Sequence, residues 1–186
     1  MKEGLHVEVV DLLRRKIDPD EYKAIRRLWI AHSVAEDRRD IPSLMATLTE
    51  DCVYTVVNSA TSWHGKEGAT CFYQQLLSSF PDIHFDLQSI VIGPQEVFEE
   101  AHVTATYREQ WLDMPPPNAQ GIEFNVTILF PWDPEQQLFT GERVYFYLKK
   151  NKLWRFQSTH LVATGLVTSK SVRCKFKVLE VKTETP

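Results

Sequence analysis

Apolar and polar positions change their spacing along the chain near Pro81. Before Pro81, two segments place apolar residues every three or four positions, which predicts amphipathic helices over 19–37 and 65–80. Asp18 can cap the first helix, and Pro19 suits its first position. The buried stripes are expected at Tyr22, Ile25, Leu28, Trp29, His32 and Ala35 in the first helix, and at Phe72, Leu76, Leu77 and Phe80 in the second.

Two shorter elements lie between these helices. Residues 43–48 follow a Pro42 break and are expected to form a short helix, whereas the β-branched and aromatic run 52–57 is typical of a strand. Residues 58–64 are expected to form a loop.

After Pro81 the apolar spacing becomes two, which is typical of strands that are buried on one face. The expected strands are 83–92, 97–111, 122–130 and 138–148, separated by turns rich in proline. Helices followed by an antiparallel meander indicate an α+β fold. Strands this long twist and coil, so we expect a cone-shaped, curved antiparallel sheet wrapped by three N-terminal helices.

The chain has 186 residues, which fits one domain of ordinary size. We expect an N-terminal extension over 1–17, a single domain over 18–148 and a basic C-terminal extension over 149–186. The C-terminal extension carries nine Lys or Arg against two Glu, although the formal net charge of the whole chain is -4. Its basic residues are expected to pair with the acidic body or, alternatively, to bind a partner protein. The overall charge does not indicate nucleic-acid binding.

The first 17 residues mix charged and apolar side chains and contain no uninterrupted apolar h-region, so they are not expected to be a signal peptide. No apolar run approaches the ~20 residues of a membrane span. A cytoplasmic protein without membrane contact is therefore expected.

Six short motifs occur in a characteristic order along the chain. They are Trp63-His64-Gly65, Phe80-Pro81-Asp82, Ile92-Gly93, the run from Thr106 to Trp111, Met114-Pro115-Pro116 and Gly121-Ile122-Glu123-Phe124. Their order and spacing, from about Tyr22 to Phe146, resemble those of the SnoaL-like polyketide cyclases of the nuclear transport factor 2-like superfamily.

The resemblance implies a catalytic pair on two neighbouring strands. A family histidine on a long strand corresponds to Tyr107 here, and the family acid after the Pro-Pro loop corresponds to Glu123. Aldol-type cyclisation needs a base and a hydrogen-bond donor to the enolate, roles that Glu123 and Tyr107 respectively suit. The replacement of histidine by tyrosine removes a base that titrates near neutrality. Alternatively, the alternation of Glu123 and Asn125 with apolar residues describes an exposed polar face.

Aromatic and histidine side chains supply the candidate substrate contacts of a pocket for a flat ring. They are Trp29, Tyr54, Trp63, His64, His102 and Trp111. The same aromatic residues are also what a core of this size contains. His32 is expected to be a core histidine, and Glu142-Arg143 is expected to be a surface pair rather than a buried pair near the cavity floor.

No metal or cofactor is expected. The Asp82-x-His84-x-Asp86 spacing is a weak metal signal, and a solvated strand face is favoured. The glycine-rich, serine-hydrolase and zinc-protease motifs are absent.

Three functional hypotheses follow. The first is a cofactor-independent cyclase, isomerase or hydratase that acts on a small apolar or aromatic carbonyl compound. The second is a non-catalytic module of the same fold that binds a ligand or dimerises, with a homodimer formed through the sheet. The third is a chain whose natural end has been replaced. The sequence names neither the substrate nor the role of residues 149–186.

Overall fold

The structure is a computed structural model that describes residues 7–148. The expected C-terminal extension therefore lies outside the described residues. The helices are α1 (Val7–Arg14), α2 (Pro19–Asp37), α3 (Ile41–Met45) and α4 (Gly65–Ser79), with a short 3-10 turn, η1, at Val57–Ser59. The strands are β1 (Leu48–Val56), β2 (Thr61–His64), β3 (His84–Ile92), β4 (Glu96–Thr106), β5 (Gly121–Asp133) and β6 (Leu138–Leu148).

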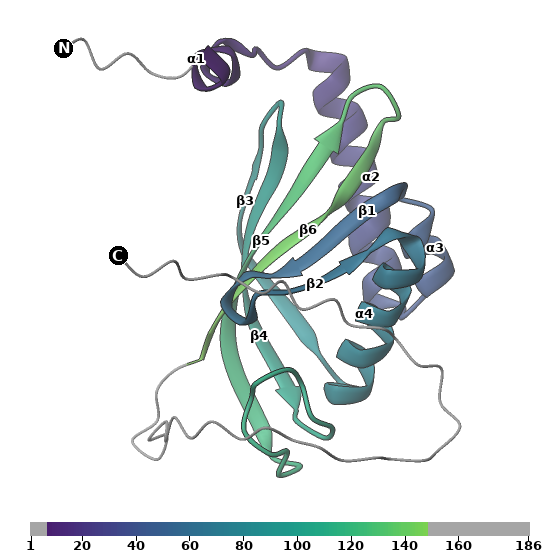
Figure 1. Ribbon diagram of the computed structural model, residues 1–186, viewed down its shortest axis with the longest axis vertical. Coiled ribbons are helices and arrows are strands. Elements are labelled where there is room, and N and C mark those ends of the chain that lie inside the picture. The colour runs from purple at the N-terminus through teal and green to yellow at the C-terminus, as the bar shows by residue number, and fades with distance from the viewer. Residues whose placement is uncertain (1–6, 149–186) are drawn as a thin grey trace, which may run out of the picture.

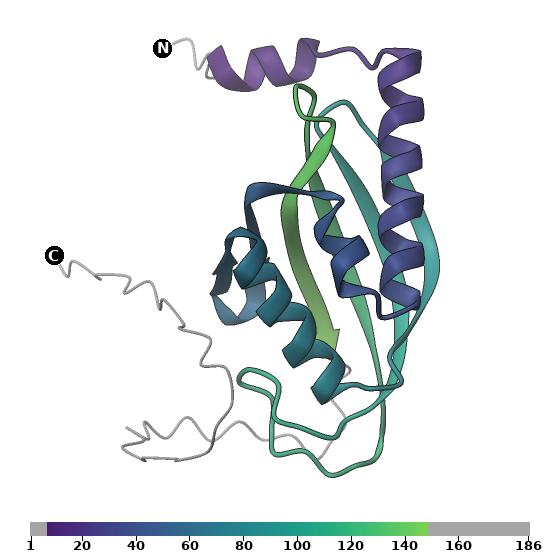
Figure 2. The same cartoon turned by 90° about the vertical axis from the view of Figure 1, so that its right-hand side faces the viewer.

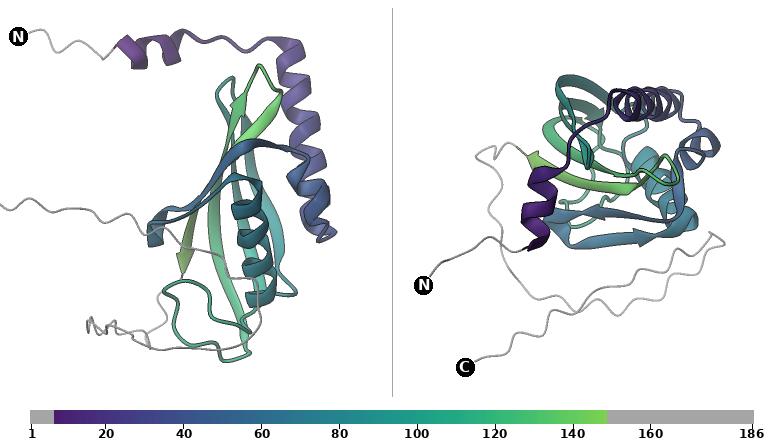
Figure 3. Two further views of the ribbon diagram at one scale, coloured as in Figure 1. Left: turned by 45° about the vertical axis from the view of Figure 1, so that its right-hand side comes forward. Right: turned by 90° about the horizontal axis from the view of Figure 1, so that it is seen from above.

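The six strands form one curved sheet in the order β2-β1-β6-β5-β4-β3. The meander from β3 to β6 is antiparallel, as the sequence predicts. The contact between β1 and β6 is parallel, so the sheet is mixed. A parallel pair is possible here because α4 and four strands separate β1 from β6 along the chain. Figures 1 and 3 show the resulting bend of the sheet.

Helices α2, α3 and α4 cover the same face of the sheet, while α1 extends away from the top of α2 (Figure 2). Every second residue of β4 is buried on the covered face, from Val97 to Ala105. The fold therefore confirms an α+β domain in which a curved sheet is covered by helices. Among residues 7–148, no helix is both long enough and apolar enough to cross a membrane.

The helix starts follow from local hydrogen bonds. The Asp18 carboxylate accepts from the backbone N–H groups of Asp20 at 2.8 Å and Glu21 at 3.1 Å, and Pro19 opens α2 as expected. Asp40 caps α3 in the same way, so that helix begins at Ile41, earlier than predicted.

Three strand predictions need correction. Strand β1 begins at Leu48, inside the helix predicted over 43–48, rather than at Cys52. The predicted loop over 58–64 contains β2, whose Trp63 pairs with Tyr54 of β1. Strand β4 ends at Thr106, before the predicted end at Trp111. The Asp82 carboxylate accepts from the Thr106 backbone N–H and hydroxyl at 2.6 Å each, while the next residue, Tyr107, exchanges backbone hydrogen bonds with the 119–120 segment.

Candidate functional site

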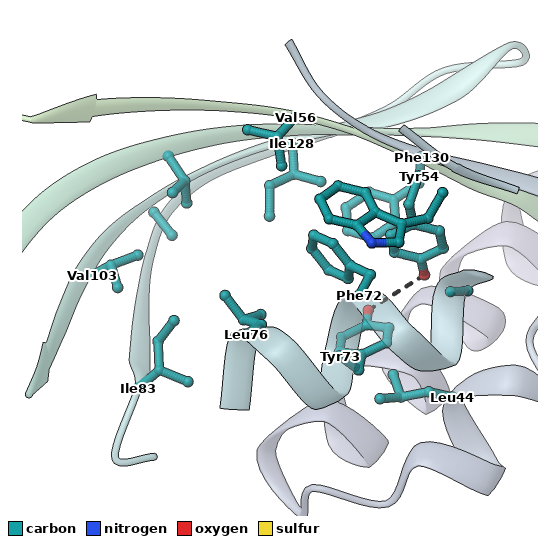
Figure 4. Packing of buried hydrophobic residues seen from close by; sticks show 14 of the residues in the cluster. Leu44, Tyr54, Val56, Phe72, Tyr73, Leu76, Ile83, Val103, Ile128 and Phe130 are labelled. Atoms are coloured by element: carbon teal, nitrogen blue, oxygen red, sulfur yellow. Dashed lines mark hydrogen bonds between the residues drawn. The ribbon is translucent and has the colours of Figure 1, made fainter. Parts of the chain in front are cut away.

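An apolar cavity lies between α4 and the covered face of the sheet. The volume open to the centre of a water molecule is about 40 Å³, which corresponds to roughly three waters. Figure 4 shows Leu76 and Ile83 on one side of this space, and Val56 and Ile128 on the other. The lining residues are Glu36, Val56, Phe72, Leu76, Phe80, Ile83, Phe85, Trp111, Met114, Phe124, Val126, Ile128, Glu142, Val144 and Phe146.

Two glutamates supply the ionisable side chains of this otherwise apolar lining. Glu36 comes from the last turn of α2, and Glu142 comes from β6. The Glu36 carboxyl makes no hydrogen bond or ion pair with the described residues. Removal from water, and then the negative charges of Glu142 and Glu99, raise the pKa of Glu36 well above its usual value. Removal from water therefore favours the protonated form of the Glu36 carboxyl group.

The Glu142 carboxylate is 3% exposed and is held at one oxygen. Its Oε1 accepts from the Tyr73 hydroxyl at 2.8 Å and lies 3.0 Å from His32 Nε2. The Tyr54 hydroxyl lies 3.3 Å from the Tyr73 hydroxyl. A dashed line marks this hydrogen bond in Figure 4. Burial, followed by the charge of Glu142, raises the pKa of both phenols well above their usual value. Both tyrosines therefore keep their protons and serve as donors.

His32 connects α2 to this carboxylate from the core. Its Nδ1 lies 2.7 Å from Thr47 Oγ1, and its ring meets Phe130 and Phe139 edge-on at centroid distances of 5.5 and 6.1 Å. The prediction of a core histidine is confirmed by its 1% exposure. Its hydrogen bonds also place it directly behind the cavity floor.

Glu99 of β4 is, with Glu142, one of two buried carboxyl groups among the described residues, and it is covered by α2. It accepts from the Trp29 indole N–H at 2.9 Å. Burial and the charge of Glu142 raise its pKa to about 7, although the Trp29 hydrogen bond acts in the opposite direction. Three acidic side chains thus share the interior near the cavity floor.

The predicted aromatic contacts are close to the cavity. Trp111 lines it directly. Trp63 stacks on Trp111 at a centroid distance of 6.3 Å, so it supports the wall from behind. Tyr54 and Trp29 bond to members of the buried acidic network and are not lining residues.

The predicted catalytic pair lies elsewhere. The Glu123 side chain is 65% exposed, on the face of β5 opposite Phe124 and Val126, which line the cavity. Tyr107 is buried, stacks on Phe80 at 5.3 Å and accepts from the Trp111 backbone N–H at 3.2 Å. Neither side chain lines the cavity.

The two predicted histidine contacts are also on the surface. His102 Nδ1 bonds to Asn125 Oδ1 at 2.9 Å, and its Nε2 lies 4.0 Å from Glu123 Oε2. His64 is exposed where α4 begins. The structure therefore brings His102 and Glu123 together on the outer face of the sheet.

Sequence reasoning missed Glu36 and favoured the wrong position for Glu142. The predicted surface pair of Glu142 with Arg143 is wrong, because Glu142 points inward and Arg143 points outward to Glu96. The spacing of both glutamates from neighbouring core residues could have indicated that they face the interior. Glu36 lies four residues after the core residue His32, and Glu142 shares the parity of Val144 and Phe146.

Within the described chain, no group of three His, Cys, Asp or Glu side chains could hold a metal ion. Asp82, part of the weak metal spacing, instead accepts the two hydrogen bonds from Thr106.

The comparison with known proteins gives one family. The model of the SnoaL-like domain matches residues 27–135. No curated protein sequence matches the chain closely enough to count as a relative.

Several solved structures share the fold. A candidate SnoaL-like polyketide cyclase from Shewanella denitrificans OS-217 is 15% identical, with a TM-score of 0.58, over 70% of this chain and 92% of that one. A candidate polyketide cyclase from Xanthomonas campestris pv. campestris is 21% identical, with a TM-score of 0.56, over 68% of this chain and 93% of that one. AclR, a candidate hydroxylase from Streptomyces galilaeus, is 17% identical, with a TM-score of 0.54, over 71% of this chain and 82% of that one. At these identities the likeness shows the fold alone.

Proposed function

The chain belongs to the SnoaL-like domain family, and from this membership and the geometry of its cavity we propose cofactor-independent acid–base catalysis on a small apolar carbonyl compound. The observation that carries the proposal is the pair of carboxyl groups, Glu36 and Glu142, in an otherwise apolar lining. Their surroundings differ, and carboxyl groups in different environments can divide the roles of acid and base.

Glu36 is the proposed acid. Burial raises the pKa of its carboxyl group and so favours the protonated form, and this carboxyl group has no hydrogen-bond partner among the described residues. A carbonyl oxygen in the cavity would accept this proton in a hydrogen bond. The same bond strengthens as negative charge develops on the oxygen, which lowers the barrier to enolate formation.

Glu142 is the proposed base. Tyr73 and His32 contact Oε1, whereas no described residue bonds Oε2. Oε2 is therefore the oxygen available to take a proton from the carbon next to the carbonyl. The roles that the resemblance assigns to Glu123 and Tyr107 pass to Glu142 and Glu36, because only the latter two line the cavity.

The lining also favours one class of substrate. Apolar and aromatic walls bury a neutral hydrocarbon skeleton. An anionic ligand would meet carboxyl groups with no cationic side chain among the lining residues. Because the space is small, a ring-sized ligand must also displace some of the lining side chains.

A proton-exchange experiment can test this function even though the natural substrate is not identified. Cyclohexanone is incubated with the protein in deuterated buffer, and NMR follows the loss of the protons next to the carbonyl. We expect exchange faster than in buffer alone, and slower exchange in a Glu36→Gln variant. Exchange at the buffer rate, with cyclohexanone shown to bind, would contradict the catalytic proposal.

The small volume of the cavity favours a second candidate, a non-catalytic module that binds a ligand or dimerises. Exposed apolar side chains on the outer face of the sheet, Val91 of β3 and Tyr147 at the end of β6, offer a surface for a homodimer formed through the sheet. This candidate predicts a dimer in sedimentation experiments and no acceleration of exchange. A Val91→Glu variant should then be monomeric, and a monomeric wild-type protein would exclude the dimer.

A further inference from the structure

The buried hydrogen bonds around Glu142 have a direction that can be deduced atom by atom. Thr47 Oγ1 lies 2.6 Å from the Leu44 carbonyl oxygen, which can only accept, so Thr47 uses its single hydroxyl proton there. Thr47 Oγ1 must then accept in its 2.7 Å contact with His32 Nδ1. His32 Nδ1 consequently carries a proton.

The other ring nitrogen faces two oxygens. His32 Nε2 lies 3.0 Å from both Glu142 Oε1 and the Tyr73 hydroxyl oxygen. Tyr73 donates its own proton to Glu142 Oε1 at 2.8 Å, so its oxygen is an acceptor toward His32. In a neutral ring with its proton on Nδ1, Nε2 could only accept. It would then face two further acceptors, Glu142 Oε1 and the Tyr73 oxygen, with no proton between them. One additional proton is needed between His32 and Glu142.

We infer that this proton resides on His32 Nε2, so that a buried imidazolium lies behind the Glu142 carboxylate that lines the cavity and His32 is the positioning residue of Glu142. Oε1 already accepts from Tyr73, which stabilises negative charge on that oxygen. Both side chains are almost completely buried, at 1% and 3% exposure. A lone charge would be costly at this depth, whereas a pair with further hydrogen bonds is tolerated.

This pair deepens the proposed function and rests on it for its catalytic role. In the resting site, His32 carries one positive charge, Glu142 carries one negative charge, and the carbonyl compound carries none. When the C–H bond breaks and an O–H bond forms at Glu142 Oε2, the electron pair moves to the carbonyl oxygen. The enolate then faces a neutral Glu142 and the retained imidazolium charge, an attraction that is strong in a site with little water.

The protonation state can be measured directly in the ¹⁵N-labelled protein. NMR spectra of the ring nitrogens are expected to show a proton on both Nδ1 and Nε2 of His32 near neutral pH. A His32→Gln variant assigns the signals by their loss, and His102→Gln, on the outer face, should leave them in place. An Nε2 without a proton would overturn the inference. A ring that stays doubly protonated in Glu142→Gln would also overturn it, because the carboxylate would not be what retains the proton.

The positioning role has a separate kinetic test. His32→Gln retains an N–H donor near the position of Nε2 but carries no charge. We expect proton exchange of cyclohexanone to slow about a hundredfold, with its apparent affinity unchanged within about threefold. An equal loss of affinity and rate, or no loss of rate, would contradict the role. If the wild-type protein shows no exchange, the proposed function fails, whereas the NMR result still decides the ion pair.

Discussion

His32 Nε2 lies 3.0 Å from Glu142 Oε1, and this contact joins residues that are 110 positions apart in the chain. It connects the buried face of α2 with β6 and places a polar network directly behind an apolar cavity. The network continues through Tyr73 to Tyr54 on one side and through Thr47 on the other. The same few hydrogen bonds therefore serve both the packing of the fold and the chemistry of the site.

The two tyrosines of the network should differ in their contribution to stability. Tyr73→Phe removes a donor to a buried carboxylate and is expected to lower the free energy of unfolding by about 2 kcal/mol. Tyr54→Phe removes a neutral contact of 3.3 Å and should cost about 1 kcal/mol or less. Urea unfolding at neutral pH measures both values. Equal losses would show that the direction assigned to these hydrogen bonds is incorrect.

Glu99 should make the stability of the protein depend on pH. Its pKa is about 7 in the folded protein, against 4.5 for the free side chain. The folded state therefore holds the proton more tightly, and the stabilisation present below about pH 4.5 is lost as the pH rises through about 7.

Glu99→Gln keeps an oxygen acceptor for Trp29 but cannot ionise. We expect the variant to be more stable than the wild type by less than about 1 kcal/mol near pH 5 and by about 3 kcal/mol near pH 8. Glu100→Gln, on the exposed side of the same strand, is the matched control. A difference that does not change with pH would mean that Glu99 titrates normally.

Gly141 should be required for the parallel contact of β1 with β6. Its backbone has φ +123°, and an added Cβ would overlap the carbonyl group of Val53. Gly141→Ala is expected to destabilise the protein by about 3 kcal/mol, since the conflict is with backbone atoms. Gly121→Ala is the control, because its Cβ would meet no atom within 4 Å. Thermal unfolding of both variants decides the question.

Trp111 should report on occupancy of the cavity. Since it is the only tryptophan among the described lining residues, a ligand that enters the cavity is expected to change its fluorescence. The change on titration with cyclohexanone should disappear in Trp111→Phe and persist in Trp132→Phe, whose ring packs on Phe139 away from the lining. A signal that survives Trp111→Phe would place the ligand elsewhere.

Local sequence patterns predict the fold well but predict the site less well. The Asp18-Pro19 start of α2 and the alternation in β6 are short-range signals, and both elements have the predicted bounds. The position of Glu123 outside the cavity depends on the register of β5 against β4, where Glu123 lies opposite Thr104. A resemblance in motif order does not specify which face of a strand a residue occupies.

The sequence also did not predict that Glu36 and Glu142 meet at the cavity, and the reason is again a long-range contact. Glu36 and Glu142 become neighbours of one cavity only when the end of α2 packs over β6, a long-range event with no local signature. Glutamates are mostly exposed in folded proteins, so composition and spacing favour an exposed position for each of them, whereas Glu142 is buried and Glu36 is half-buried. Trp111 was predictable because large aromatic residues are usually buried wherever they occur in a domain.

The central claim is that Glu142 takes a proton from a carbonyl compound bound in the cavity. It is tested most directly by comparing the exchange rate of cyclohexanone protons in Glu142→Gln and Glu123→Gln under conditions where both variants are folded. Loss of about a hundredfold or more is predicted for Glu142→Gln, with the rate of Glu123→Gln equal to that of the wild type. Unchanged exchange in Glu142→Gln, or its loss in Glu123→Gln alone, would contradict the account.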